Sequence, residues 1–179
     1  LVIGDNNTFR EYCTVHRGTV QANRLTQIRS NNLFMAYTHI AHDCMVGSHC
    51  IMANGASIAG HVHVGDHAII GGMTGVHQFC HIGDHCFVGA NSLILKDIPP
   101  YVMASGQPAK PFGLNSEGLK RRGFDKDVIL NIKRAYKAIY RQGLTVDEAV
   151  NKIADLDGDM VELAMFSDFI KNSSRGIIR

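Results

Sequence analysis

The chain has 179 residues, of which 45% are hydrophobic and 19% charged, and its formal net charge at pH 7 is +2. This length is enough for one long domain or two small ones with an ample core. A net charge this small does not indicate nucleic-acid binding. No apolar run in the sequence approaches the length of a transmembrane helix.

An apolar residue recurs every six positions through much of the first hundred residues. Twelve consecutive positions keep this phase: Ile28, Phe34, Ile40, Val46, Met52, Ile58, Val64, Ile70, Val76, Ile82, Val88 and Ile94. At this hydrophobic content, chance would give such a run about once in ten thousand. Because three hexads make one triangular coil, the repeat predicts a parallel β-helix whose coils stack at about 4.8 Å.

The repeat is already in progress where the sequence begins, since Ile3, Phe9 and Val15 keep the period. We therefore expect further coils upstream of Leu1. Between Val15 and Ile28 the period breaks, because these residues are thirteen positions apart instead of twelve. The polar interval 18–24 predicts a loop that projects from the coil, and such loops often carry function.

A second column, two positions before each apolar one, holds small or slim side chains that suit a tight corner. All five cysteines belong to it: Cys13, Cys44, Cys50, Cys80 and Cys86. Their number is odd and the sequence contains no CxxC motif, so we expect packing as small hydrophobic side chains and no disulfides. Free thiols favour a reducing compartment.

Three regions follow from this pattern: a β-helix over 1–98, a linker over 99–115 and a helical domain over 116–179. The β-helix is expected to end at Pro99 and Pro100, because proline cannot donate to a strand ladder. The next fifteen residues contain two glycines and two further prolines, which indicates an extended linker.

Helical periodicity then takes over. Asp125 is a plausible N-cap for an amphipathic helix that Gly143 would end. Thr145 and Glu148 have the spacing of a capping box, which predicts the start of a second helix. A third helix is expected through the apolar residues Leu163, Phe166 and Ile170.

Ten histidines are distributed over the chain, and the repeat places four of them on one edge of three successive coils. These are His39, His42, His61 and His77. Because residues eighteen apart lie above one another, their mutual distances should be about 5–10 Å. The other six are expected mostly at outward, solvated positions: His16, His49, His63, His67, His81 and His85.

Two chemistries fit four imidazoles beside Asp43. A neutral His42 could act as a general base, with Asp43 fixing its tautomer and stabilising the imidazolium. Alternatively, three imidazoles could hold a zinc ion that activates water. Spacing alone does not separate the two, and a non-catalytic scaffold would leave the cluster without a purpose.

The chain resembles the bacterial UDP-N-acetylglucosamine O-acyltransferase family, which catalyses the first step of lipid A synthesis. The His39–Asp43 segment His-Ile-Ala-His-Asp, joined to Asn-x-Glu-Gly-Leu-Lys-Arg-Arg at residues 115–122, carries this resemblance. Gly60-His61 and Val76-His77-Gln78-Phe79 add to it. The resemblance runs from Leu1 to Arg179 and departs only at the start, where the family carries several more coils.

The resemblance implies a left-handed β-helix, a homotrimer with its site between neighbouring subunits, and a cytoplasmic enzyme without cofactor or metal. A 3-hydroxyacyl group would pass from acyl carrier protein to the 3-hydroxyl of UDP-N-acetylglucosamine. His42 would be the base and Asp43 its support, while the Gly60 N–H would stabilise the thioester oxyanion.

The resemblance also implies the substrate contacts. The sugar nucleotide or the acyl amide and hydroxyl would be contacted by His39, His61, His77 and Gln78. The nucleotide and the pantetheine arm would be bound by Asn115, Glu117, Arg121 and Arg122. Ala90 would help to set acyl length, because a larger side chain there would block the groove.

A basic surface near the first predicted helix is a candidate docking site for the acidic carrier protein. It consists of Lys120, Arg121, Arg122, Lys133, Arg134, Lys137 and Arg141. Two other enzyme classes share the repeat: the N-acyltransferase two steps later in lipid A synthesis, and a γ-carbonic-anhydrase-like zinc hydro-lyase. The Asn-x-Glu-Gly-Leu-Lys-Arg-Arg stretch favours the O-acyltransferase.

Overall fold

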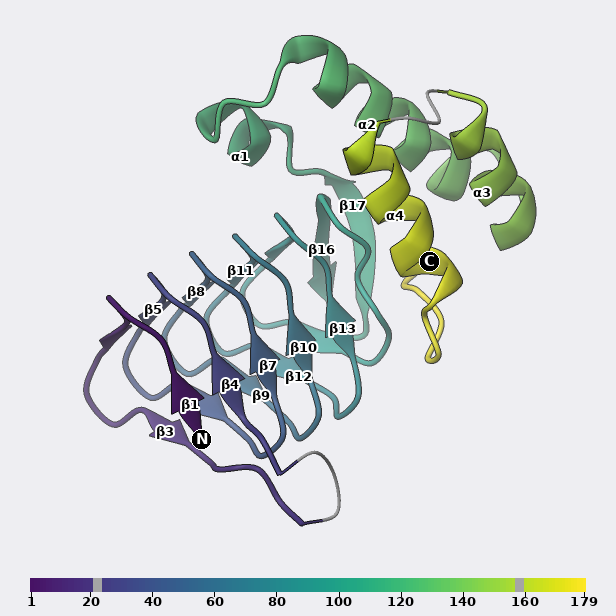
Figure 1. Cartoon of the computed structure of the whole chain (residues 1–179). Coiled ribbons are helices and arrows are strands. Elements are labelled where there is room, and N and C mark those ends of the chain that lie inside the picture. Colours follow the sequence, from purple (N-terminus) through teal and green to yellow (C-terminus); the bar gives the residue numbers. More distant parts are fainter. Residues whose placement is uncertain (21–23, 157–159) are drawn as a thin grey trace.

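The computed structural model describes residues 1–20, 24–156 and 160–179. The chain first winds as a β-helix and then forms helices that cover the C-terminal end of the β-helix (Figure 1). Among the described helices, none has both the length and the apolar character needed to cross a bilayer.

Three parallel sheets form the faces of the β-helix. Sheet A contains β1 (Val2–Ile3), β4 (Gln27–Ile28), β7 (Met45–Val46), β10 (His63–Val64) and β13 (His81–Ile82). Sheet B contains β2 (Thr8–Phe9), β5 (Leu33–Phe34), β8 (Ile51–Met52), β11 (Ile69–Ile70) and β14 (Phe87–Val88). Sheet C contains β3 (Thr14–Val15), β6 (His39–Ile40), β9 (Ser57–Ile58), β12 (Gly75–Val76) and β15 (Leu93–Ile94). The predicted parallel β-helix is confirmed.

Each of the strands β1–β15 has two residues, and from β4 on the second residue is buried in the core. All twelve apolar residues of the six-residue repeat are buried, with at most 4% of their surface exposed. Removing one such side chain down to alanine typically costs about 2–5 kcal/mol, because the cavity collapses only in part. The repeat is therefore the hydrophobic core of the coils.

The coils turn at corners where one residue takes a left-handed backbone conformation. Asp43 and His61 have φ values of 60° and 61°, and both lie at the corner between sheets C and A. The His61 N–H donates to the carbonyl of His42 at 3.1 Å, so the corners of successive coils are hydrogen-bonded. Aspartate, asparagine and histidine tolerate this conformation better than most residues.

The first coil is longer than the later ones. Val2 pairs with Gln27, 25 residues on, whereas Gln27 pairs with Met45, only 18 residues on. The extra residues fall in the interval predicted to project as a loop. Positions 21–23 of that interval lie outside the described residues, while Gly18, Thr19 and Val20 are described.

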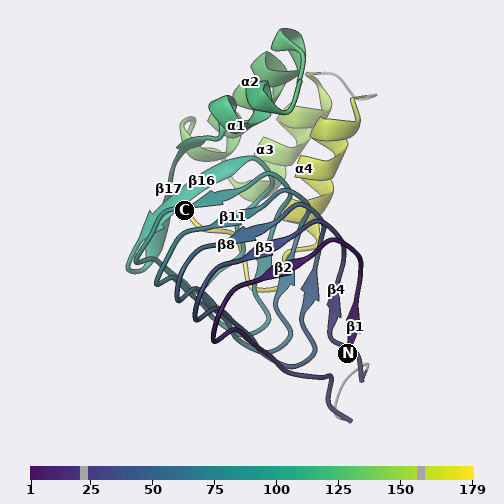
Figure 2. The same ribbon diagram turned by 90° about the vertical axis from the view of Figure 1, so that its left-hand side faces the viewer.

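The predicted linker over 99–115 is wrong. β16 (Val102–Gly106) pairs in parallel with β14, and β17 (Ala109–Leu114) returns antiparallel to it, so a hairpin extends sheet B (Figure 2). Pro108 falls between the two strands, and Pro111 lies on the outermost strand of the sheet. A missing N–H costs little at either place, so prolines do not exclude strands here.

The described residues after the hairpin form the helices α1 (Ser116–Arg121), α2 (Lys126–Tyr140), α3 (Val146–Ala154) and α4 (Val161–Lys171). Asp125 is the N-cap residue of α2, although its side chain makes no capping bond. The capping box is confirmed, because Thr145 and Glu148 exchange side-chain and backbone hydrogen bonds at the start of α3. The third predicted helix corresponds to α4.

The cysteines are all free, and Cys44, Cys50, Cys80 and Cys86 are buried while Cys13 is half-buried. Burial raises the pKa of the Cys44 thiol to about 11 and that of Cys50 to about 12. The pKa of Cys80 is raised to about 11 in the same way. At neutral pH these groups are neutral thiols that pack as hydrophobic side chains, as predicted.

A thiol titration tests this packing. In the native protein at pH 8, Ellman's reagent should label Cys13 rapidly and leave the four buried thiols unmodified, because thiolates are the reactive species. In guanidinium chloride all five thiols should react. Fast native labelling of more than one thiol per chain would contradict the buried column.

Candidate active site

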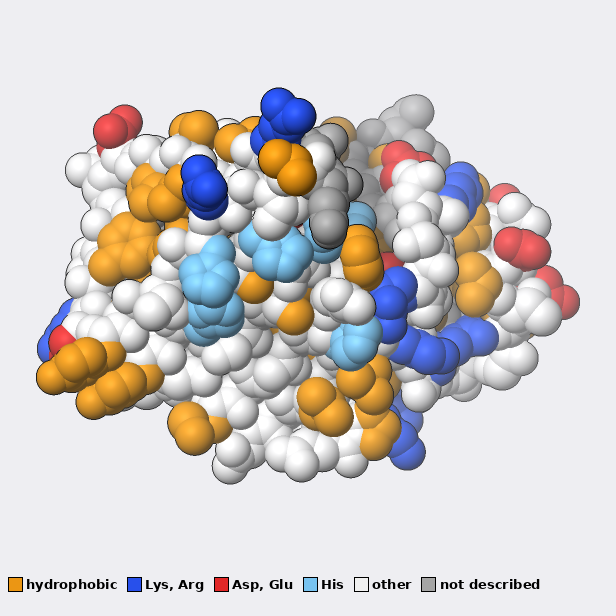
Figure 3. All heavy atoms as spheres, turned by 90° about the horizontal axis from the view of Figure 1, so that it is seen from below, with side chains coloured by type: hydrophobic (Ala, Val, Ile, Leu, Met, Phe, Trp, Pro, Cys, Tyr) orange, Lys and Arg blue, Asp and Glu red, His pale blue; other side chains and the backbone are white. Residues whose placement is uncertain are grey.

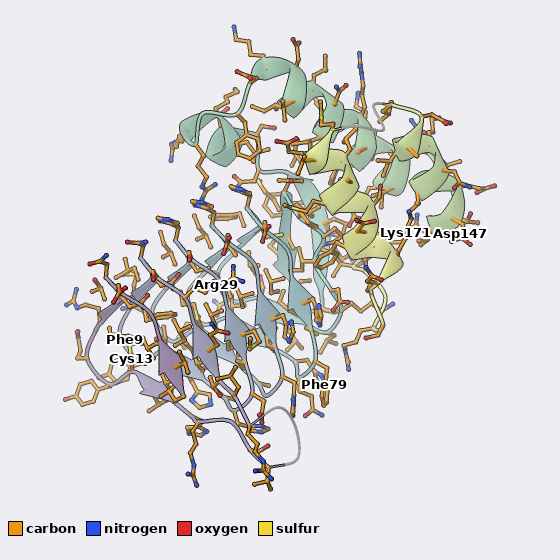
Figure 4. All side chains as sticks on the ribbon, in the orientation of Figure 1. Phe9, Cys13, Arg29, Phe79, Asp147 and Lys171 are labelled. Atoms are coloured by element: carbon orange, nitrogen blue, oxygen red, sulfur yellow. The ribbon has the colours of Figure 1, made fainter. Side chains whose placement is uncertain are left out.

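The corner between sheets C and A carries the predicted catalytic residues. Strand register places His42, Gly60 and Gln78 in one column over three coils, because Ile40, Ile58 and Val76 are paired. The adjacent column contains Asp43, His61 and Phe79. Histidine side chains gather on the surface seen from below in Figure 3, and Phe79 lies at the lower edge of the coils in Figure 4.

His42 and Asp43 are directly hydrogen-bonded. The His42 Nδ1 lies 2.9 Å from Asp43 Oδ2, and the carboxylate is only 3% exposed whereas the imidazole is 42% exposed. The carboxylate also accepts the Thr19 hydroxyl at 2.7 Å and the Thr19 N–H at 3.0 and 3.1 Å. A fixed, buried carboxylate therefore holds an accessible imidazole.

The carboxylate of Asp43 stays ionised. Burial would raise its pKa, but the hydrogen bonds from the Thr19 hydroxyl, from His42 and from the Thr19 N–H outweigh that effect and lower the pKa to about 2. Since an ionised carboxylate only accepts hydrogen bonds, Nδ1 of His42 must be the protonated nitrogen. In the neutral imidazole the lone pair then lies on the other nitrogen, Nε2, which has no hydrogen-bond partner among the described residues.

The His42 ring packs directly against Gly60 of the next coil. A Cβ built on Gly60 would lie 2.7 Å from Cε1 and 2.8 Å from Nε2 of His42, so a side chain at position 60 would displace the ring. Gly60 stands two residues after the inward-pointing Ile58, as Ser48 and Asp66 stand two residues after Val46 and Val64. The backbone N–H at this position makes no hydrogen bond to a neighbouring strand. At Ser48 and Asp66 a carboxylate accepts this N–H, whereas at Gly60 it has no acceptor among the described residues.

His61 completes the cluster on the same corner. Its ring meets that of His42 edge to face at 5.2 Å and stacks on Phe79 at 4.5 Å. In the described part of the chain, the ligand atoms close enough to share a metal ion belong to His42, Asp43 and His61. This gives two imidazoles instead of the three of the zinc alternative, and Thr19 already bonds the carboxylate.

His39, His77 and Gln78 lie on the same edge without joining this cluster. The Nδ1 of His39 lies 2.7 Å from the Thr14 hydroxyl, and its ring meets that of His16 edge to face at 4.8 Å. Burial, followed by the neighbouring His16, lowers the pKa of His39. His77 and Gln78 are exposed, and His77 Nδ1 lies 3.1 Å from the Gln78 carbonyl oxygen.

The residues expected to bind the nucleotide lie at a different corner, between sheets A and B. Asn115 is the N-cap of α1 and accepts the Gly118 N–H at 3.2 Å, while its Nδ2 donates to the His85 carbonyl at 2.9 Å. Arg122 donates to the His67 carbonyl at 3.2 Å. Glu117 is exposed and pairs with Lys120.

Arg121 and Arg122 end helix α1 and do not start a helix. Arg121 is exposed and Arg122 is half-buried against the β-helix.

Ala90 is exposed at the third corner, which follows β14 and leads to β15. The predicted site residues are therefore divided among three edges of one chain. A cavity of about 460 Å³ lies elsewhere, between sheet A and α4, and none of the predicted site residues lines it.

Sequence reasoning missed two features of the site. Thr19 lies in the interval 18–24 that was predicted to project as a loop. The break in the six-residue repeat was the only signal that this interval is unusual. The outward histidines are also more than solvated surface, since His67, His81 and His85 are half-buried, and His63 stacks on His81 at 4.5 Å.

The β-helix and the C-terminal region each match a known protein family. The bacterial transferase hexapeptide family matches residues 25–60 and 61–96, which defines the β-helix as that of a hexapeptide-repeat transferase. The second domain of the family described as Udp N-acetylglucosamine O-acyltransferase matches residues 97–178, which include the hairpin and the helices.

Solved structures extend the match over the whole chain. LpxA from Acinetobacter baumannii is 52% identical with a TM-score of 0.95, over 99% of this chain and 69% of that one. UDP-N-acetylglucosamine O-acyltransferase from Moraxella catarrhalis is 49% identical with a TM-score of 0.95, again over 99% and 69%. The Bacteroides fragilis enzyme is 33% identical with a TM-score of 0.92, over 99% and 81%.

The chain belongs to the UDP-N-acetylglucosamine O-acyltransferase family of lipid A biosynthesis. The resemblance drawn from the two sequence motifs is confirmed. The zinc hydro-lyase and the scaffold lose their support, and the match over 97–178 separates the chain from the related N-acyltransferases.

Gly60→Ala tests the contact between Gly60 and His42. The new methyl group would occupy the place of the ring, so acyl transfer should fall by about a hundredfold while the fold persists, since a side-chain tip can rotate away. The matched control is Gly75→Ala, whose methyl group would meet only Leu93 Cδ1 at 3.9 Å. Equal activity of the two variants would contradict the contact.

Proposed function

We propose that this protein transfers a 3-hydroxyacyl group from acyl carrier protein to the 3-hydroxyl of UDP-N-acetylglucosamine, with His42 as general base. The carrying observation is the hydrogen-bonded series Thr19–Asp43–His42, which leaves Nε2 of His42 free above Gly60. An ionised carboxylate at Nδ1 fixes the tautomer and stabilises the imidazolium.

The reaction follows from this arrangement. Nε2 of His42 takes the proton of the sugar 3-hydroxyl while its oxygen forms a bond to the thioester carbonyl carbon. The developing oxyanion accepts the Gly60 N–H, which has no other acceptor among the described residues. When the C–S bond breaks, the imidazolium returns the proton to the thiolate of the carrier protein.

Substrate binding is proposed to use several edges of the β-helix. His39, His61, His77 and Gln78 would contact the sugar or the acyl group beside His42. Asn115, Glu117, Arg121 and Arg122 would bind the nucleotide and the pantetheine arm. Ala90 would limit acyl length at the third corner.

Because these residues lie on separate edges of one chain, we propose a homotrimer in which each site combines edges of neighbouring subunits. The proposed compartment is the cytoplasm, where a reducing medium keeps the five free cysteines as thiols. No cofactor is needed for the proposed step, because the acyl donor is already a thioester.

His42→Ala tests the role of the base. Transfer to UDP-N-acetylglucosamine should fall by two or more orders of magnitude, the scale of a lost general base, whereas KM should change little. The assay measures product formation from a series of 3-hydroxyacyl carrier proteins. Transfer that survives the substitution would remove His42 as the base.

Docking of the acidic carrier protein is proposed on the exposed basic residues of α2. Charge reversal of Lys133 and Lys137 should raise KM for the acyl carrier protein about tenfold at low salt, and added salt should shrink the difference. KM for acyl-pantetheine, which lacks the protein, should not change. Lys171→Glu at the end of α4 is the control (Figure 4). Unchanged KM in the double reversal would end this proposal.

A further inference from the structure

Three histidines form a continuous stack along the corner between sheets A and B. The rings of His49 and His67 are 4.7 Å apart at an angle of 4°, and those of His67 and His85 are 4.8 Å apart at 10°. The inner end of the stack is closed by Phe124, which meets His85 edge to face at 5.0 Å. Only His49 is exposed.

The backbone carbonyls of the two inner stack residues hold the residues proposed to bind the nucleotide. The His67 carbonyl accepts a hydrogen bond from Arg122 at 3.2 Å, and the His85 carbonyl accepts one from Asn115 at 2.9 Å. The Asn115 N–H donates further to the Tyr101 carbonyl at 2.8 Å. Backbone carbonyls of two stack residues therefore hold both ends of helix α1, at its N-cap Asn115 and its C-cap Arg122.

The direction of these carbonyls depends on an unusual backbone conformation. His67 and His85 have φ values of 58° and 57°, a region that non-glycine residues adopt at some cost. Each N–H donates at 2.8 Å to the coil before, His67 to Ser48 and His85 to Asp66. Ring stacking restrains these carbonyls further, because each stacked ring is attached to the Cα next to the carbonyl carbon.

The charges around the stack favour neutral imidazoles. His67 faces Arg122, His49, His85 and Asp66, and only the last of these would stabilise a positive charge. His85 faces His67, Arg122 and Asp66, and its ring is near Tyr101. The Nδ1 of His85 and the Nη1 of Arg122 are buried without a hydrogen-bond partner among the described residues. A proton on that Nδ1 would therefore lack an acceptor beside a guanidinium.

We propose that the stacked rings of His67 and His85 are positioning residues for Arg122 and Asn115, and that they perform this role only while both imidazoles are neutral. This inference rests on the proposed nucleotide-binding role of Asn115 and Arg122. Affinity for UDP-N-acetylglucosamine then depends on side chains that do not touch it.

The sign of the pH dependence follows. Burial, then the charges of His67 and Arg122, lowers the pKa of His85 to about 4, and burial with Arg122 and His49 lowers that of His67. His67 and His85 are therefore neutral at pH 7.5, and because both pKa values lie below the usual histidine value of about 6.5, protonation of His85 requires a pH near 4. Acidification to about pH 4 should thus weaken nucleotide binding, measured as Kd apart from the chemical step.

Two kinds of substitution separate the ring from its charge. His67→Asn and His85→Asn remove the ring but suit a positive φ, whereas His67→Phe and His85→Phe keep a stackable ring that cannot titrate. His49→Asn, at the exposed end of the same stack, is the matched control. Calorimetry with UDP-N-acetylglucosamine at pH 7.5 and pH 4, together with kcat and KM at pH 7.5, gives the readout.

The Asn variants should raise Kd and KM about tenfold at pH 7.5 with kcat within about twofold, equivalent to about 1.4 kcal/mol. The Phe variants should bind within about threefold of the unsubstituted protein at pH 7.5 and lose part of the weakening at pH 4. His49→Asn should have neither effect. Combining His67→Asn with Arg122→Gln should give much less than the sum of the two losses.

Absence of UDP-N-acetylglucosamine binding by the unsubstituted protein would contradict the proposed function. Normal binding by that protein and by both Asn variants would instead overturn the positioning role alone. Circular dichroism reports whether the Asn variants fold. If they do not, the Phe variants decide, because a pH dependence of Kd identical to that of the unsubstituted protein would also overturn the inference.

Discussion

The parallel hydrogen-bonding of successive coils is the constraint on which the rest of this molecule depends. Its 18-residue register assigns each side chain to a column, so distant residues become neighbours without any long-range search. Burial of the second residue of successive strands forms the core, and this core holds the corners that carry the site residues. The corners, which lie between the paired strands, carry the polar groups of the site.

The functional corner shows how a rigid scaffold prepares an imidazole for proton transfer. Asp43 is buried and ionised because Thr19 gives it two donors, and this carboxylate leaves His42 a single tautomer. Gly60 contributes by lacking a side chain, which lets the ring lie flat against the next coil. Catalytic geometry here results from three ordinary requirements: a paired carboxylate, a tight corner and free space.

Periodicity alone predicted the β-helix, its core, the inward cysteines and the edge shared by His42 and His61, because register is a property of sequence spacing. It did not predict Thr19, whose contact with Asp43 depends on the path of an irregular loop. It misjudged residues 99–115, since prolines at a turn and on an outer strand look like those of a linker. The His67–His85 stack was missed because periodicity reports which way a side chain points and not what it touches.

The β16–β17 hairpin has a consequence for the length of the solenoid. β16 takes the place of a further coil in sheet B, and β17 then runs in the opposite direction with Pro111 on the outer side. A coil of another molecule that approached this edge would meet β17, which runs antiparallel and lacks the N–H of Pro111. The hairpin therefore ends sheet B with an antiparallel strand, which does not continue the parallel register that a further coil would need.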